Sequence, residues 1–245
     1  MIQHAAVTPY IEAAFVIALR THAAEGRKWT ELSHRLAGRV AVVPLAVNLQ
    51  RIGHLDLVLR SMEDEHAEVA ANNGSDLAFH YQMMLSETWV VACYEALRAI
   101  RQRENEFAKQ SLGNNPNHIS DGISNLASFR GIFADFELLR MPIAKYEIAK
   151  DDKLGAPLVM WRSPANGDAS DEVVYDKKNP SRTHIMPAGL SSSGSVMWQA
   201  FDHRVPSSHW IDRRELSNRM LALADEIEPA GLREARLAAE KAKPK

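Results

Sequence analysis

Apolar side chains recur every three or four residues through most of the first 150 positions, which is the spacing of one face of a helix. The pattern predicts three helices at the start of the chain, over residues 8–24, from 30 towards 44, and over 45–71. Thr8 and Pro9 support the first start, because threonine caps helices and proline is tolerated at the first helical position. The segment "NNGS" at 72–75 breaks the pattern, and Asp76 is expected to cap a long helix over 76–107.

A loop rich in glycine, asparagine and proline occupies residues 111–122. The helical pattern then returns, and a further helix should begin at Ser124 or Ser128 and continue to Lys150. Pro142 lies inside this segment and lacks a backbone N–H, so it predicts a kink or a break near that position.

Between residues 154 and 203 the pattern changes to short β-branched and aromatic runs separated by turn-forming residues, which is typical of strands. "GLSSSGS" at 189–195 is expected to be a turn between two of them. The sequence therefore predicts a mainly α protein, with a multi-helix, bundle-like body and a small antiparallel β appendage. The expected parts, which together form one domain, are a helical body over 1–153, a hairpin or small sheet over 154–203, a helix over 204–228 that begins near Trp210 and packs on the body, and a mobile or helical tail over 229–245.

Composition and charge exclude some classes of protein. Hydrophobic residues make up 46% of the 245 residues and charged residues 24%, which argues against global disorder. The formal net charge of −2 lacks the basic excess of a domain that binds nucleic acid over its whole surface. The N-terminal segment is interrupted by charged residues and unlike a signal peptide, and the apolar run at 40–49 is too short to span a bilayer. We therefore expect a cytoplasmic protein without a membrane segment.

The predicted helix over 76–107 is apolar on most of its surface but carries a line of polar side chains. On a helix that turns about 100° per residue, four of them lie within about 40° of one another: His80, Glu87, Tyr94 and Arg98. Glu95 lies beside this line and can pair with Arg98. We call these five residues the polar stripe. It can face solvent, another helix or a ligand.

An unpaired buried Glu87 would be costly, so a stripe that faces the protein needs a basic partner. The predicted helix after residue 124 offers Arg130, Arg140 and Lys145, together with Glu137. Arg130 and Glu137 are seven residues apart and share a face, while Glu137 and Arg140 are neighbours. We expect an arginine of this helix to meet the polar stripe in a charged network with a structural role.

Two Glu-x-x-His spacings occur in the chain, Glu31 with His34 and Glu63 with His66. On helices each places a carboxylate and an imidazole on one face. The pair of motifs resembles the ligand set of di-iron carboxylate bundles, in which two further helices each supply a glutamate. The resemblance implies a metal site at these four residues, with Glu87 and Glu137 as nominal additional ligands.

Arg60 and His66 in "RSMEDEH" have a spacing that resembles the Arg-x(4–6)-His motif of HEPN-type ribonucleases. Those proteins are all-helical and commonly dimeric, and they cleave RNA without a metal. The resemblance implies that Arg60 steadies the scissile phosphate and that His66 transfers a proton. Three intervening acidic residues, Glu63 to Glu65, oppose RNA binding at this position.

The single cysteine, Cys93, is expected to be a buried free thiol, because it lies in an apolar helix. The chain contains no phosphate-binding, dinucleotide-binding, nucleophile-elbow or zinc-protease motif. No cofactor is expected. The leading hypothesis is a binding, regulatory or structural module, in which a homodimer is compatible with the helical body. The alternatives are the HEPN-like ribonuclease and the metal-carboxylate bundle, and the sequence identifies no partner.

Overall fold

A computed structural model describes residues 6–71, 78–111, 122–162, 172–204 and 207–227. The chain is mainly α-helical with a small antiparallel β appendage, as the sequence predicts. Its helices are α1 (Thr8–Thr21), α2 (Ala23–Val40), α3 (Val43–Ala71), α4 (Phe79–Ser111), α5 (Ala127–Lys145) and α6 (Arg213–Glu226), with short 3-10 turns at Ile123–Asn125 and Asp151–Lys153. None of the helices within these ranges is long and apolar enough to cross a membrane.

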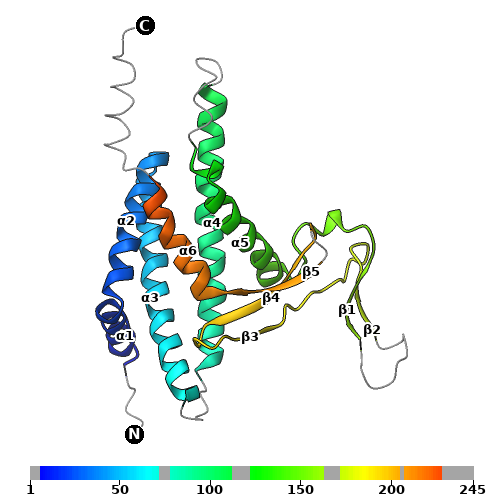
Figure 1. The fold of residues 1–245 in the computed structure, drawn as a ribbon, viewed down its shortest axis with the longest axis horizontal. Helices are drawn as coiled ribbons and strands as arrows, with labels where there is room; N and C mark the ends of the chain where they lie inside the picture. Colours follow the sequence, from blue (N-terminus) through cyan, green and yellow to red (C-terminus); the bar gives the residue numbers. More distant parts are fainter. Residues whose placement is uncertain (1–5, 72–77, 112–121, 163–171, 205–206, 228–245) are drawn as a thin grey trace.

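The helical body is a bundle in which α2, α3 and α6 lie side by side and the long helix α4 packs behind them (Figure 1). Helix α5 crosses α4 and leads to the sheets. The core contains several large aromatic side chains that are almost fully buried, among them Trp29, Trp89 and Phe136. Gly53 allows α2 and α3 to approach closely, because a Cβ at this position would lie 2.6 Å from Cγ of Trp29.

Two helix boundaries differ from the prediction. The first two helices meet at His22, so Thr30 lies inside α2 and does not start a helix. Helix α5 continues through Pro142 but ends at Lys145, five residues before the predicted end. Tyr146 closes it in a left-handed conformation, with φ of 56°, and donates its N–H to the carbonyl oxygen of Pro142 at 3.0 Å.

The appendage consists of two antiparallel sheets. The two-stranded sheet pairs β1 (Leu158–Arg162) with β2 (Glu172–Tyr175), and the three-stranded sheet has the order β3 (Ala188–Leu190), β4 (Val196–Asp202) and β5 (Ser207–Asp212). Burial alternates strictly along β4, which has one face on the helical body. The β1–β2 hairpin lies at the end of the molecule away from α1 and α2 (Figure 1).

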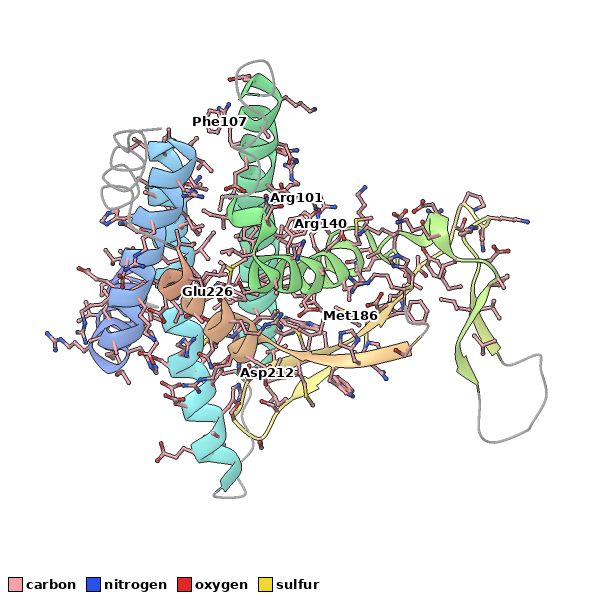
Figure 2. The ribbon with its side chains drawn as sticks, turned by 45° about the horizontal axis from the view of Figure 1, so that its top comes forward. Arg101, Phe107, Arg140, Met186, Asp212 and Glu226 are labelled. Atoms are coloured by element: carbon pink, nitrogen blue, oxygen red, sulfur yellow. The ribbon has the colours of Figure 1, made fainter. Side chains whose placement is uncertain are left out.

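The last strand extends further than the sequence predicts. Trp210 lies in β5 opposite Gln199, so the predicted helix start at this position is wrong. Strand pairing with β4 continues to Asp212, which then caps α6 by accepting the N–H of Glu215 at 3.1 Å. Figure 2 shows Asp212 at this junction between strand and helix. The β region therefore ends at 212 and not at 203.

Residues 191–195 of the predicted segment 189–195 form a turn between β3 and β4, while Gly189 and Leu190 belong to β3, and the turn docks on the helical body. Gly194 has φ of 73°, and a Cβ there would lie 2.1 Å from the carbonyl oxygen of Glu63 on α3. The side-chain amide of Gln82 on α4 donates to the carbonyl oxygen of Gly194 at 2.8 Å. The turn therefore joins the sheet to α3 and α4. The predicted break at 72–75, the cap at Asp76, most of the loop at 111–122 and the tail over 229–245 lie outside the described residues.

Candidate functional site

The polar stripe of α4 does not form one site. His80 is exposed near the start of the helix, and Glu87 is partly buried. Burial raises the pKa of Glu87 above its usual value, and none of the described residues forms an ion pair with it. The expected arginine partner of Glu87 is therefore not found within the described part of the chain.

An arginine of α5 does meet the stripe, but about two helical turns further along than Glu87. Arg140 lies 3.5 Å from Glu95, and its guanidinium is stacked 5.4 Å from the ring centre of Tyr94. Glu95 also pairs with Arg98 at 2.6 Å. Only the pair of Arg140 with Glu95 joins α5 to α4, and because both side chains are partly exposed to water it stabilises the crossing of these helices only weakly.

Burial raises the pKa of Tyr94, and the neighbouring carboxylate of Glu137 adds to the effect. The ring of Tyr94 packs against Phe133 at 5.3 Å between centres. Glu137 itself forms an ion pair with Lys150, and Lys145 is exposed. Arg130 and Glu137 do share a face, because both line one cavity beside α4.

The most concentrated group of charges lies elsewhere, between α3 and α6. Asp56, Arg60 and Glu63 project from α3 towards Arg213 at the start of α6, and we call these four residues the buried network. Asp56, Glu63 and Arg213 are fully buried, and Arg60 is 2% exposed. The network holds two positive and two negative charges, so it is neutral when all four groups are ionised.

Arg213 binds both carboxylates. Its Nε and Nη2 donate to the two oxygens of Glu63 at 2.5 and 2.8 Å, and its Nη1 donates to Oδ1 of Asp56 at 2.5 Å. The guanidinium also lies 5.2 Å from the ring centre of Trp89. A single side chain of α6 is therefore fixed by two helices of the body.

The other oxygen of Asp56 accepts two further hydrogen bonds, each 2.8 Å long, from Nε1 of Trp29 and Nε of Arg60. Arg60 reaches α6 through its Nη2, which donates to Ser217 at 2.7 Å and to Asn218 at 2.8 Å. Each charge of the network thus has direct partners, as a buried charge requires.

The electrostatic balance favours the ionised network. Burial alone would raise the pKa of Asp56, but the positive charges of Arg213 and Arg60 outweigh it and lower this pKa below its usual value. Burial alone would likewise lower the pKa of Arg213, but Asp56 and Glu63 outweigh it and raise this pKa. The carboxylate and the guanidinium are therefore both charged at neutral pH.

The structure does not place the predicted nuclease residues in an exposed cleft. Arg60 belongs to the buried network, and His66 is 4% exposed with its ring edge-on to Phe79, 6.4 Å away. Two of the acidic residues between them have different roles: Glu63 binds Arg213 in the core, and Asp64 pairs with Arg214 at 2.6 Å on the surface.

The predicted metal ligands also do not converge. Glu31 pairs with Arg35 on the same helix, His34 is exposed, and Glu63 is neutralised by Arg213. No group of three or more histidine, cysteine or acidic side chains suited to a metal occurs among the described residues. The geometry required by the metal-carboxylate hypothesis is therefore missing there.

Asp56 and Arg213 are not among the site residues predicted from the sequence, although the chain contains a signal for one of them. Asp56 lies three or four residues from Ile52 and Leu59, which are core positions of α3, so its carboxylate had to be buried. Arg60 and Glu63 follow at four and seven residues, on the same face. Nothing in the local sequence distinguishes Arg213 from Arg214.

Comparisons with protein-family models, with curated proteins and with solved structures find no match for the chain.

Proposed function

We propose that this chain is a non-catalytic binding or structural module of the cytoplasm that works as a homo-oligomer. The observation that supports a structural role is that the charged groups of the buried network are paired with one another inside the protein. Its acids and bases are buried and directed at one another, so they offer no free proton donor or acceptor to a substrate.

Self-association is supported by the surface of α1. A helix that is apolar on all sides is normally buried, yet of the 14 residues of α1 only Ala18 is buried. Its exposed large apolar side chains include Tyr10 at 71% and Ile17 at 57%, with Val16 and Leu19 each at 40%. Such a surface is typical of a protein interface.

The occupant that fits this surface is a second copy of α1. Glu12 and Arg20 are the only charged residues of the helix, and they lie four residues before and after Val16. In an antiparallel pair centred on Val16, each Glu12 lies opposite Arg20 of the other copy. Both charges are then paired across a twofold axis while the apolar side chains are buried between the helices.

The oligomeric state tests this proposal. Light scattering after gel filtration is expected to give twice the chain mass of 27.3 kDa. Glu12→Arg should give the monomer, and the charge exchange Glu12→Arg/Arg20→Glu should restore the dimer. Val16→Asp, at the centre of the pair, should also dissociate it, whereas Ile185→Asp, at a residue 81% exposed outside α1, should not. A wild-type monomer at high concentration would overturn the proposal.

RNA cleavage tests the alternative function. We expect single-stranded and structured RNA to stay intact with the wild-type protein. Cleavage that disappears in Arg60→Ala/His66→Ala, with the fold retained by circular dichroism, would replace the structural proposal by the HEPN-like ribonuclease. Cleavage that persists in this double variant would exclude Arg60 and His66 as its source.

A further inference from the structure

A cavity beside α4 is lined by residues that belong neither to the buried network nor to α1. It has a volume of about 320 Å³ and lies between α4, the turn at Ile123–Asn125 and the first half of α5. Lys150 and Arg204 complete its edge. Figure 2 shows Arg101 where α4 passes α5, and its guanidinium lies 5.1 Å from the ring centre of Phe133. The volume is that of a small-molecule site.

The lining carries an excess of positive charge. Four cations, Arg101, Arg130, Lys150 and Arg204, face one carboxylate, that of Glu137. Lys150 is paired with Glu137, and Arg204 holds Asp202 through hydrogen bonds of 2.6 to 3.0 Å.

The other two arginines of the lining, Arg101 and Arg130, are different. Within the described part of the chain, neither Arg101 nor Arg130 forms an ion pair with a carboxylate. The closest acidic side chain along α4 is Glu104, and its oxygens already accept the backbone N–H groups of Ile123 at 2.7 Å and Ser124 at 2.8 Å. Two guanidinium groups are therefore available to a ligand.

We propose that this cavity binds a small phosphate monoester, with its phosphate held by Arg101 and Arg130. A guanidinium matches phosphate oxygens with two parallel hydrogen bonds, so two arginines satisfy one phosphate group. The uncharged lining residues Asn105 and Ser124 provide hydrogen bonds for the esterified part. The overall charge of −2 and the neighbouring acids Glu104 and Glu137 favour a small ligand over a nucleic acid strand.

Calorimetric titration tests this proposal with phenyl phosphate, inorganic phosphate and benzoate, at about 0.15 M salt to screen non-specific attraction. We expect saturable binding of phenyl phosphate, weaker binding of inorganic phosphate and none of benzoate. Arg101→Gln and Arg130→Gln should each weaken it about tenfold or more, because each removes charged hydrogen bonds. Glu137→Gln should strengthen binding, because it removes the carboxylate of the lining. Arg103 is exposed and pairs with Glu106 on the same helix, so Arg103→Gln should leave the affinity for phenyl phosphate unchanged.

Three results would overturn the proposal. One is the absence of saturable binding up to about 10 mM. Another is equal weakening by the Arg103 variant, which would mean that only the general charge matters. The third is binding of benzoate as tight as that of phenyl phosphate, which would make the site one for carboxylates. None of these results bears on the proposed dimer through α1, because light scattering tests that dimer separately.

Discussion

Replacement of Arg213 by methionine tests the role of the buried network most directly. Methionine fills much of the same volume but carries no charge and no donor, so both carboxylates lose their shared partner. Asp56 retains Arg60 and Trp29, whereas among the described residues Glu63 retains only Arg214, whose Nε is 3.7 Å from Oε2. Arg213→Met therefore leaves Glu63 as a nearly unpaired charge in the core.

The expected loss of stability is large. Removal of one partner from a buried ion pair costs about 3–5 kcal/mol, because the remaining charge stays buried. The stacking of Arg213 on Trp89 would be lost as well, but methionine packs on aromatic rings and offsets part of this loss. We expect the free energy of unfolding to fall by about 4 kcal/mol. This is a large part of the total of about 5–15 kcal/mol that is usual for a folded domain.

Urea unfolding followed by circular dichroism measures this difference. Arg219→Met is the matched control: Arg219 also lies on α6, but its side chain is 38% exposed and it forms an ion pair with Asp135 at the surface. Its loss should cost at most about 1 kcal/mol. The double variant Arg213→Met/Glu63→Gln should recover part of the lost stability, because it removes the unpaired charge. If Arg213→Met and Arg219→Met unfold within about 1 kcal/mol of each other, the network does not hold α6 in place.

Acid should reduce the difference between wild type and Arg213→Met. In the wild type the pKa of Asp56 is lowered in the folded state, so its stabilisation is present above the unfolded pKa of about 3.9 and is lost as the pH falls below it. Arg213 is the strongest cause of this lowering, so the variant has less to lose. The difference in the free energy of unfolding between wild type and Arg213→Met should therefore be smaller at pH 3 than at pH 5. A difference that grows in acid would contradict this role of Arg213.

Three further predictions follow from individual residues. Gly194→Ala should lower the free energy of unfolding by about 2 kcal/mol or more, because the added Cβ meets the carbonyl oxygen of Glu63. Gly155 has open space around it, so Gly155→Ala should be nearly neutral in the same urea experiment. Cys93 is fully buried, and burial and then the charge of Asp56 raise its pKa, so a thiol reagent at pH 8 should label the protein only in denaturant; rapid labelling of the native protein would contradict this. Hydrogen bonds from Arg204 lower the pKa of Asp202 to about 2. Asp202→Asn should therefore lower the free energy of unfolding at pH 7 by about 1 kcal/mol, a modest loss because the side chain of Arg204 is half exposed. This loss should vanish as the pH falls from about 4 to 2.

The helical elements could be predicted because their signal is local. Helix α3 begins at Val43 and ends at Ala71, close to the predicted limits, since its leucines repeat with the helical period. The end of α5 at Lys145 could not be placed, because the left-handed residue that closes the helix is Tyr146, whereas glycine or asparagine is the usual signal for such an end. Trp210 was assigned to the wrong element, because strand pairing with Gln199 depends on a residue eleven positions away.

The candidate sites were harder to predict, because a polar pattern on one helix does not identify what faces it. The stripe on α4 is real, but its arginine partner contacts Tyr94 and Glu95 and not Glu87. Arg60 was considered as a ligand for RNA because its spacing from His66 is local, whereas its actual partners Ser217 and Asn218 are more than 150 residues away. Only tertiary packing shows that Arg60 and Ser217 are both buried and face one another.

Glu63 explains why the contact between α3 and α6 contains buried charges within an otherwise apolar core. Its carboxylate fixes the first residue of α6, while its backbone carbonyl oxygen is the atom that excludes a side chain at Gly194 in the turn between β3 and β4. Ser195 of the same turn accepts the N–H of Arg214 at 3.0 Å, so the turn also touches α6 directly. An apolar cluster of equal volume would bury α6 against α3 as well, but it would tolerate rotation of α6 about its axis. The two-oxygen contact of Glu63 with Arg213 permits one orientation, and that orientation places strand β5 and the turn where they close on α3.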